Sequence, residues 1–106
     1  NKMDLKKICI NLLLNAIRYT KKGYIRVSRK DHVILFENNG EEIQEEYKEE
    51  IFKPFFTISK SKNRKNSGFG LGLSIVDNLS INNQYNCFLH SSNKKKTIFY
   101  LQKDYS

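Results

Sequence analysis

Apolar and polar positions repeat with two different periods along the chain. In residues 3–19 the apolar side chains recur every three or four positions, a spacing typical of a helix. One face of this helix carries Leu5, Cys9, Leu12, Leu13 and Ala16. Leu14 and Ile17 extend the apolar surface beyond that face. A helix that is apolar over so much of its circumference is expected to be largely buried.

Shorter runs with the character of β-strands come next. Residues 24–29 alternate between apolar and polar side chains, and residues 32–37 are mostly apolar. Lys30 and Asp31 lie between them and are typical turn residues. The sequence therefore predicts a hairpin whose second strand is the more buried of the two.

The second half of the chain begins with a break in this pattern. Residues 44–52 predict a short helix, which Pro54 stops because proline cannot continue a helix. Residues 57–69 are polar, basic and poor in core side chains, so we expect a mobile loop there. A second long helix is predicted from Gly70 to about Asn82. Its shared apolar face consists of Leu71, Ile75, Val76 and Leu79.

Two more strands are predicted at the end of the chain. They cover residues 84–91 and 96–102 and are joined by a turn that contains Asn and Lys. The order of elements predicts an α+β fold, a two-layer sandwich with helices on one face of a mixed, mainly antiparallel sheet. No linker composition appears, so residues 1–106 are expected to form a single domain.

Composition narrows the possible classes of protein. Hydrophobic residues make up 39% of the 106 residues, which is enough for one core, and no apolar run approaches the about 18 residues that a membrane span needs. The net charge of +8 suggests nucleic-acid binding as one alternative. However, only four of the 19 basic residues are Arg and most Lys residues fall in turns, which favours biased composition over a designed basic stripe. A positive field would still attract a polyphosphate.

Two cysteines occur in apolar patterns. Cys9 falls in the first helix and Cys87 in the third strand, without the spacing of a zinc site. We expect both to be buried free thiols in a reducing compartment.

The first helix also carries a polar stripe. Asn11, Asn15 and Arg18 are four and three residues apart, so they share one face. An amide oxygen can bind Mg²⁺, which prefers oxygen ligands and keeps substrate phosphates in its shell, and an arginine one turn later could contact a phosphate. The alternative is that these side chains cap or bridge neighbouring strands.

Glycines recur just before the second long helix. Gly68, Gly70 and Gly72 are two positions apart and would leave backbone N–H groups free at a helix N-terminus, which is an anion site. A flexible hinge is the alternative. The basic side chains that precede them could form a lid over a nucleotide or a solvated charge run: Lys60, Lys62, Arg64 and Lys65.

Three smaller features each have a structural interpretation. Asn38, Asn39 and Gly40 follow a buried strand and suit either the edge of an adenine or an ordinary turn. Aromatic residues around Pro54 are expected to anchor a loop to the core: Phe52, Phe55 and Phe56. His32 and His90 fall in strand patterns with no nucleophile nearby and are interpreted as structural.

These motifs together resemble one family. The string NLLLNAIRYT resembles the N box of the histidine kinase ATP-binding domain, ENNG its first glycine box, IFKPFFT its F box and NSGFGLGLSIV its second glycine box. The resemblance covers nearly the whole chain. The family is part of the larger group of gyrase, heat-shock chaperone and mismatch-repair ATPases, which share an α/β sandwich fold.

The resemblance implies a function and a site. The chain would bind Mg·ATP and donate the γ-phosphate to a histidine on a separate dimerisation domain, absent here, and so serve a response regulator. Asn15 would bind Mg²⁺ with help from Asn11, Arg18 would contact phosphate, and residues 57–67 would form the ATP lid. The remaining nucleotide-binding set would be Tyr19, Asn38, Gly40, Ile43, Lys60, Lys62, Gly68, Gly70, Leu71 and Gly72.

Two departures from the family pattern matter. Asn38 stands where the family usually has an Asp that bonds the adenine amino group, and Glu42 replaces the second Gly of that box. Weaker or less selective ATP binding is expected, because a charge-assisted hydrogen bond is lost. A degenerate regulatory module is therefore one alternative.

A serine kinase of the anti-sigma type is another alternative, suggested by FKPFFT. In those relatives the position of Asn11 resembles a Glu that acts as a general base, and an amide cannot act as one. Asn11 thus favours a histidine kinase. The resemblance further implies a monomeric cytoplasmic domain of a dimeric, membrane-anchored parent, with no nucleic-acid partner and no membrane contact of its own.

Overall fold

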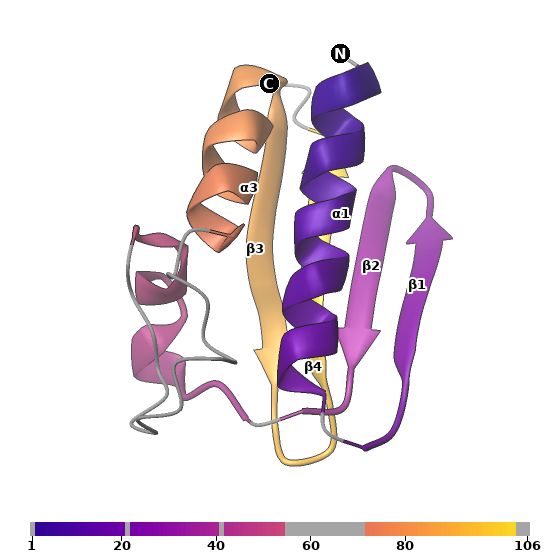
Figure 1. Ribbon diagram of the computed structural model, residues 1–106, viewed down its shortest axis with the longest axis vertical. Coiled ribbons are helices and arrows are strands. Elements are labelled where there is room, and N and C mark those ends of the chain that lie inside the picture. Colours follow the sequence, from indigo (N-terminus) through magenta and orange to yellow (C-terminus); the bar gives the residue numbers. More distant parts are fainter. Residues whose placement is uncertain (1, 21, 41, 55–71, 104–106) are drawn as a thin grey trace.

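The fold is a two-layer α+β sandwich, as the order of elements predicts. The computed structural model describes residues 2–20, 22–40, 42–54 and 72–103. Its elements in chain order are α1 (Lys2–Tyr19), β1 (Ile25–Lys30), β2 (Val33–Asn38), η1 (Glu45–Tyr47), η2 (Glu50–Phe52), α3 (Gly72–Asn82), β3 (Tyr85–Ser92) and β4 (Thr97–Lys103). Figure 1 shows α1 and α3 side by side on one face of the sheet. Neither helix is long and apolar enough to cross a membrane.

The four strands form one sheet in the order β1-β2-β4-β3. Each of the three pairings is antiparallel, and β4, the last strand of the chain, lies between β2 and β3. The register places Phe36 opposite Phe99, and Phe99 opposite Leu89. Because side chains alternate across a strand, these three form a row on the face that the helices cover.

Each strand begins and ends one residue later than the sequence predicts. Two residues in the turns before β2 and β3 have a positive φ. Asp31 has a φ of 54° and Gln84 a φ of 62°, so both adopt the left-handed conformation and lie outside the adjacent strands. The β1–β2 loop therefore consists of Asp31 and His32, between the paired residues Lys30 and Val33.

The short helix predicted over residues 44–52 is instead a pair of 3₁₀ turns, η1 and η2. Glu45, Glu46 and Glu49 are exposed, and of the six residues in the two turns only Ile51 is fully buried. A segment with so few core contacts gains little from packing as a longer helix. Lys53 is extended, with φ −79° and ψ 143°, as expected for a residue before proline.

The core lies between the helices and the inner face of β2, β4 and β3. Its buried members are Ile8, Leu12, Phe36, Ile51, Val76, Cys87, Leu89, Phe99 and Leu101. Cys9 and Cys87 are both free thiols, as predicted, but only Cys87 is fully buried and Cys9 is partly exposed.

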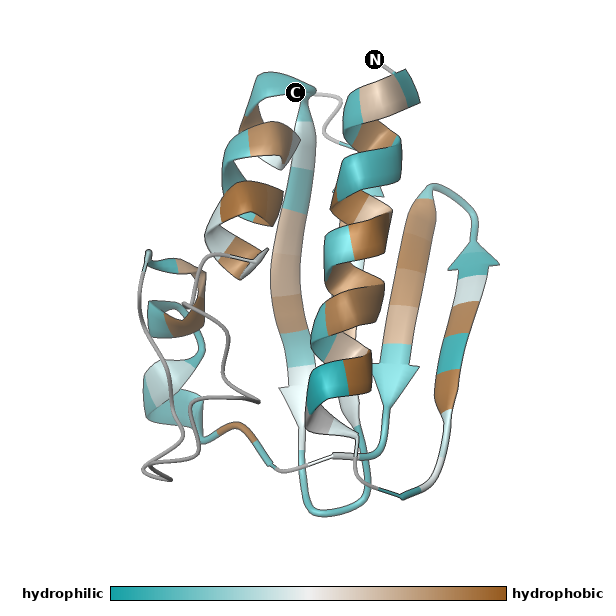
Figure 2. Cartoon of the chain, in the orientation of Figure 1, coloured by the Kyte–Doolittle hydropathy of each residue, from teal (hydrophilic) through white to brown (hydrophobic). Residues whose placement is uncertain are grey.

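The expected burial of three apolar helix residues is wrong. Leu14 is 50% exposed and Ile17 58%, because α1 turns the side with Ile8 and Leu12 toward the core. Figure 2 shows the brown surface of α1 continuing onto a side that no described element covers. On α3, Val76 is buried and the preceding Ile75 is 42% exposed, since it lies about 100° further round the helix.

Candidate functional site

Asn11 of α1 lies beside the start of α3. The Asn11 side-chain nitrogen donates a hydrogen bond to the Lys7 carbonyl oxygen at 2.8 Å, which leaves the amide oxygen for another partner. A methyl group placed on Gly72 would lie 3.9 Å from that oxygen. The first long helix and the end of the glycine-rich segment are therefore neighbours, although they are far apart in the sequence.

The first turn of α3 suits an anion. The leading N–H groups of a helix have no partners within it, and the helix dipole places partial positive charge there. No acidic residue occupies this turn. Ser74 and Val76 are buried, so the helix is held firmly against the rest of the protein just after its start.

The C-terminal half of α1 supplies the other predicted polar groups. Asn15 is partly buried one turn after Asn11, and Arg18 is exposed in the last turn of the helix. Tyr19 is the last residue of α1, and its side chain lies outside the described part of the structure. Asn11, Asn15 and Arg18 thus occupy successive positions on one helix, as their spacing predicts.

Polar side chains that are buried or partly buried lie where β2 ends, on the face of the sheet that the helices cover. Asn38 is only 5% exposed, and its amide nitrogen donates to the Thr20 hydroxyl at 3.0 Å. Thr97 is paired with Asn38 across β2 and β4, and its hydroxyl lies 2.6 Å from that of Ser92. The Ser92 hydroxyl also accepts a hydrogen bond from the Ile43 backbone N–H at 2.8 Å. We call Thr20, Asn38, Ser92 and Thr97 the polar end of the inner face.

The sequence did not identify three of these residues: Thr20, Ser92 and Thr97. Thr97 is the first residue of β4 and precedes four apolar or aromatic residues, which is a weak signal on its own. Its significance comes from the register, because pairing with Asn38 places it on the inner face at the strand end. Register depends on contacts that are distant in sequence, so these hydroxyls could not be assigned from the chain alone.

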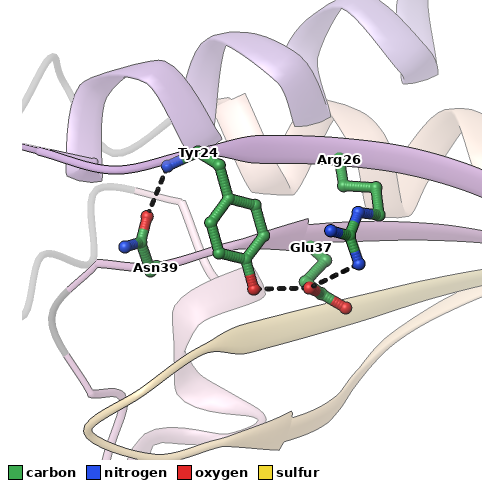
Figure 3. A network of polar contacts seen from close by, with 4 residues as sticks. All are labelled: Tyr24, Arg26, Glu37 and Asn39. Carbon is green, nitrogen blue, oxygen red and sulfur yellow. Dashed lines mark hydrogen bonds and ion pairs between the residues drawn. The ribbon is translucent and has the colours of Figure 1, made fainter.

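A second cluster of polar side chains lies on the opposite face of the sheet and contains a carboxylate. Glu37 precedes Asn38 and therefore points to the opposite face of the sheet. There it accepts a hydrogen bond of 2.5 Å from the Tyr24 hydroxyl and lies 3.6 Å from the Arg26 guanidinium, as Figure 3 shows. The hydrogen bond to Glu37 raises the pKa of Tyr24. Arg26 also stacks over the Tyr24 ring, 5.2 Å from its centroid.

Asn39 has a structural role in the connection between α1 and β1. Its side-chain oxygen accepts a 2.7 Å hydrogen bond from the Tyr24 backbone N–H, also visible in Figure 3. Gly23 has a φ of 139°, and a Cβ placed there would overlap the Asn39 side chain. Asn39 therefore stabilises a turn, whereas Asn38 belongs to the polar end.

Several predicted residues lie outside the described part of the chain. These are Lys60, Lys62, Arg64, Lys65, Gly68, Gly70 and Leu71, together with the predicted lid over residues 57–67. Gly40 and Glu42 are partly buried just after β2. Ile43 reaches the polar end through its backbone N–H, while its side chain packs against the core.

The aromatic and histidine predictions can be compared with described contacts. Phe52 packs edge-on against Phe99, with ring centroids 6.1 Å apart and planes at 84°, so it anchors η2 to the core as expected. Phe55 and Phe56 lie outside the described residues. His90 stacks on Tyr100 at 4.1 Å on the outer face of the sheet, which agrees with a structural role.

Comparison with known families identifies the class of this domain. The chain belongs to the histidine kinase-, DNA gyrase B- and HSP90-like ATPase family, whose model matches residues 1–106.

Curated relatives place the chain among the sensor histidine kinases. It is 35% identical over 82 residues to the sensor histidine kinase CusS of Escherichia coli K12, covering 73% of this chain and 17% of CusS. It is 28% identical over 107 residues to the sensor histidine kinase RppB of Synechocystis, covering 96% of this chain and 24% of RppB. The chain thus spans less than a quarter of the length of these relatives, and corresponds to a histidine kinase catalytic and ATP-binding domain.

Solved structures show the same architecture. The catalytic domain of histidine kinase ThkA matches with a TM-score of 0.74 at 32% identity, covering 98% of this chain and 70% of that one. Full-length ShkA in complex with AMPPNP matches with a TM-score of 0.73 at 23% identity, covering 94% of this chain and 21% of that one. At that identity the ShkA match supports the fold alone.

Proposed function

We propose that this chain binds Mg·ATP and donates the γ-phosphate to a histidine on a separate dimerisation domain in two-component signalling. The observation that carries the proposal is the position of the Asn11 amide oxygen beside Gly72 at the start of α3. In this proposal the amide oxygen binds a cation, and the neighbouring N-terminus of α3 binds an anion. Mg·ATP would need both kinds of group.

The residues present fit a magnesium ion. Asn11 uses its amide nitrogen within the helix, so its oxygen remains for a cation, and Asn15 follows one turn later. Among the described residues no group of three or more His, Cys, Asp and Glu side chains could hold a metal ion. Following the family resemblance, we propose that Asn15 and Asn11 would hold Mg²⁺, with phosphate oxygens and water as further ligands. When bound, the ion supplies neutralisation of phosphate charge.

The protein groups have separate roles in this proposal. The α3 N-terminus with Gly72, and the family positions Gly68 and Gly70, hold the phosphates, and Arg18 contacts them from α1. Asn38 bonds the base from the polar end. Phosphoryl transfer needs positioning and charge neutralisation more than covalent chemistry, and Asn11 supplies no general base. The acceptor imidazole is itself the nucleophile, which suits a site without a base at that position.

The remaining nucleotide contacts in the proposal follow the family pattern. Tyr19, Gly40, Ile43 and Leu71 line the nucleotide, while Lys60 and Lys62 belong to the lid. Residues 1–106 act as one domain whose partners are the phosphoacceptor domain of the parent and, through it, a response regulator. We place the domain in the cytoplasm, which supplies ATP, with the parent anchored in the membrane. ShkA, solved with AMPPNP, shows that a protein of this fold binds an ATP analogue.

A degenerate regulatory module is the second candidate, and Asn38 favours it. The buried neutral amide, bonded to Thr20, stands where the family's charged acceptor is expected. Loss of a charge-assisted hydrogen bond lowers affinity for the adenine amino group. The two candidates differ in one measurable property, which is whether the chain binds ATP tightly enough to use it.

Calorimetric titration of the chain with ATP, with and without Mg²⁺, tests the proposal. We expect Mg²⁺-dependent binding that Asn15→Ala abolishes, while circular dichroism shows an unchanged fold. Asn78→Ala is the matched control, because Asn78 is exposed on the other helix and should leave affinity unchanged. Affinity no better than millimolar in the unaltered chain would favour the degenerate module. Unchanged affinity in Asn15→Ala would remove Asn15 from the site.

A further inference from the structure

The polar end contains an unusual choice of groups for recognising a base. Every described side chain that hydrogen-bonds within it is an amide or a hydroxyl: Asn38, Thr20, Thr97 and Ser92. The Glu37 carboxylate, one residue before Asn38, is bound to Tyr24 on the opposite face of the sheet. Among the described hydrogen bonds of the polar end, none is made by a charged side chain.

The Asn38–Thr20 pair can work in two orientations. As the structure has it, the Asn38 nitrogen donates to the Thr20 hydroxyl oxygen at 3.0 Å, and the Asn38 amide oxygen is available to accept from a ligand. If the amide rotates by half a turn, its oxygen faces Thr20 and its nitrogen faces the ligand. A hydroxyl both donates and accepts, so Thr20 remains hydrogen-bonded in either orientation.

The neighbouring hydroxyls have the same freedom. Either Ser92 or Thr97 can be the donor in their 2.6 Å contact, and the Ser92 oxygen accepts from the Ile43 backbone in both cases. An aspartate at position 38 would behave differently. An ionised carboxylate only accepts, so it matches an exocyclic amine and leaves a carbonyl oxygen of a ligand unpaired.

We propose that the polar end accepts 6-oxo purine nucleotides as well as adenine nucleotides, with Asn38 as the residue that sets this tolerance. The inference rests on the proposed function, since it assumes that the base lies against Asn38. With a 6-amino group the amide oxygen accepts, and with a 6-oxo group the amide nitrogen donates. Specificity of this kind is lost whenever a buried polar group can satisfy both ligands.

Inosine triphosphate is the sharpest probe, because it differs from ATP only in the 6-amino group being replaced by oxygen, with a proton on the adjacent ring nitrogen. The experiment titrates ATP and inosine triphosphate separately into the chain in the presence of Mg²⁺. We expect the two dissociation constants to agree within about tenfold, since each base forms one neutral hydrogen bond with Asn38. Asn38→Asp should widen the ratio in favour of ATP by roughly tenfold to a hundredfold, because the carboxylate faces an unpaired carbonyl.

Asn39→Asp is the matched control. It adds the same charge one residue away and keeps the side-chain oxygen that accepts from the Tyr24 N–H, so the ratio should stay as in the unaltered chain. A preference for ATP above a hundredfold in the unaltered chain would overturn the inference alone, as would an unchanged ratio in a folded Asn38→Asp variant. If Asn38→Asp does not fold, the ratio of the two dissociation constants in the unaltered chain tests the inference. Failure to bind ATP at all would remove the proposed function and this inference together.

Discussion

The centre and the end of the inner sheet face are equally buried but chemically different. At the centre, Phe36 and Phe99 are each 3% exposed and pack against α1 and α3. Two residues away along the same strands, Asn38 is 5% and Thr97 3% exposed. The register pairs like with like, since Phe36 is opposite Phe99 and Asn38 is opposite Thr97.

This difference separates stability from function within one surface. Burying apolar side chains stabilises the fold, whereas burying an amide or a hydroxyl costs free energy unless it is hydrogen-bonded, and then contributes little net stability. The polar end meets that requirement through Thr20, Ser92 and the Ile43 backbone. We infer that its polarity serves a ligand, and that the centre alone holds the layers together.

The largest expected effect comes from removing a side chain at the centre. Leu12→Ala should lower the free energy of unfolding by about 2–5 kcal/mol, because Leu12 is 2% exposed and its loss leaves a cavity between helix and sheet. Chemical denaturation measures the change. Leu14→Ala, on the exposed side of the same helix at 50% exposure, is the matched control and should cost well under 1 kcal/mol. Equal losses would mean that α1 packs on a different side.

The sequence predicts the centre of the inner face better than it predicts the polar end. Helical and strand periods predict most of the elements and the burial of Leu12 and Val76, but the apolar face predicted for the first helix omits Ile8, which is 0% exposed. The expected burial of Leu14 and Ile17 fails, since spacing says how apolar a helix is but not how much of it neighbouring elements cover. The short helix over residues 44–52 fails for a similar reason, as its few inward side chains support only isolated turns.

The motifs of the site could be predicted from the sequence, but the hydrogen bonds of the polar end could not. Spacing along one helix places Asn11 and Asn15 together, and the nearness of Gly72 was expected only from the resemblance. Thr20 and Thr97 join Asn38 through tertiary contacts and strand register, which depend on pairing between distant segments. Asn38 and Asn39 are chemically identical neighbours, and only the alternation of β2 with the positive φ of Gly23 separates their roles.

An intermediate effect on the free energy of unfolding is expected at the centre of the inner face when the pH is raised. Burial, with smaller contributions from Asp77 and Cys9, raises the pKa of Cys87 from the ordinary value of 9.0 to about 12. Between pH 9 and 12 the unfolded thiol ionises and the folded thiol does not, so unfolding releases a proton. The stability is therefore fully present below pH 9 and should fall by roughly 1 kcal/mol per pH unit above it.

Denaturation curves at several alkaline pH values, compared between the unaltered chain and Cys87→Ala, isolate this contribution. The variant starts less stable but should lose less stability from pH 9 upward. Cys9→Ala removes a partly exposed thiol and serves as the control, which should retain most of the alkaline loss. Parallel curves for Cys87→Ala and the unaltered chain would show that Cys87 does not titrate as its burial requires.

The smallest effect on stability should come from the polar end, where the effect on binding is greatest. The double change Asn38→Leu with Thr20→Val replaces both partners of one hydrogen bond with apolar side chains of similar size. Such paired replacement is close to neutral or stabilising, so the free energy of unfolding should change by less than about 1 kcal/mol. ATP affinity, measured by calorimetry on the same sample, should be lost, because no group remains to pair with the base. A loss of more than about 2 kcal/mol would instead show that the hydrogen bond between Asn38 and Thr20 stabilises the fold.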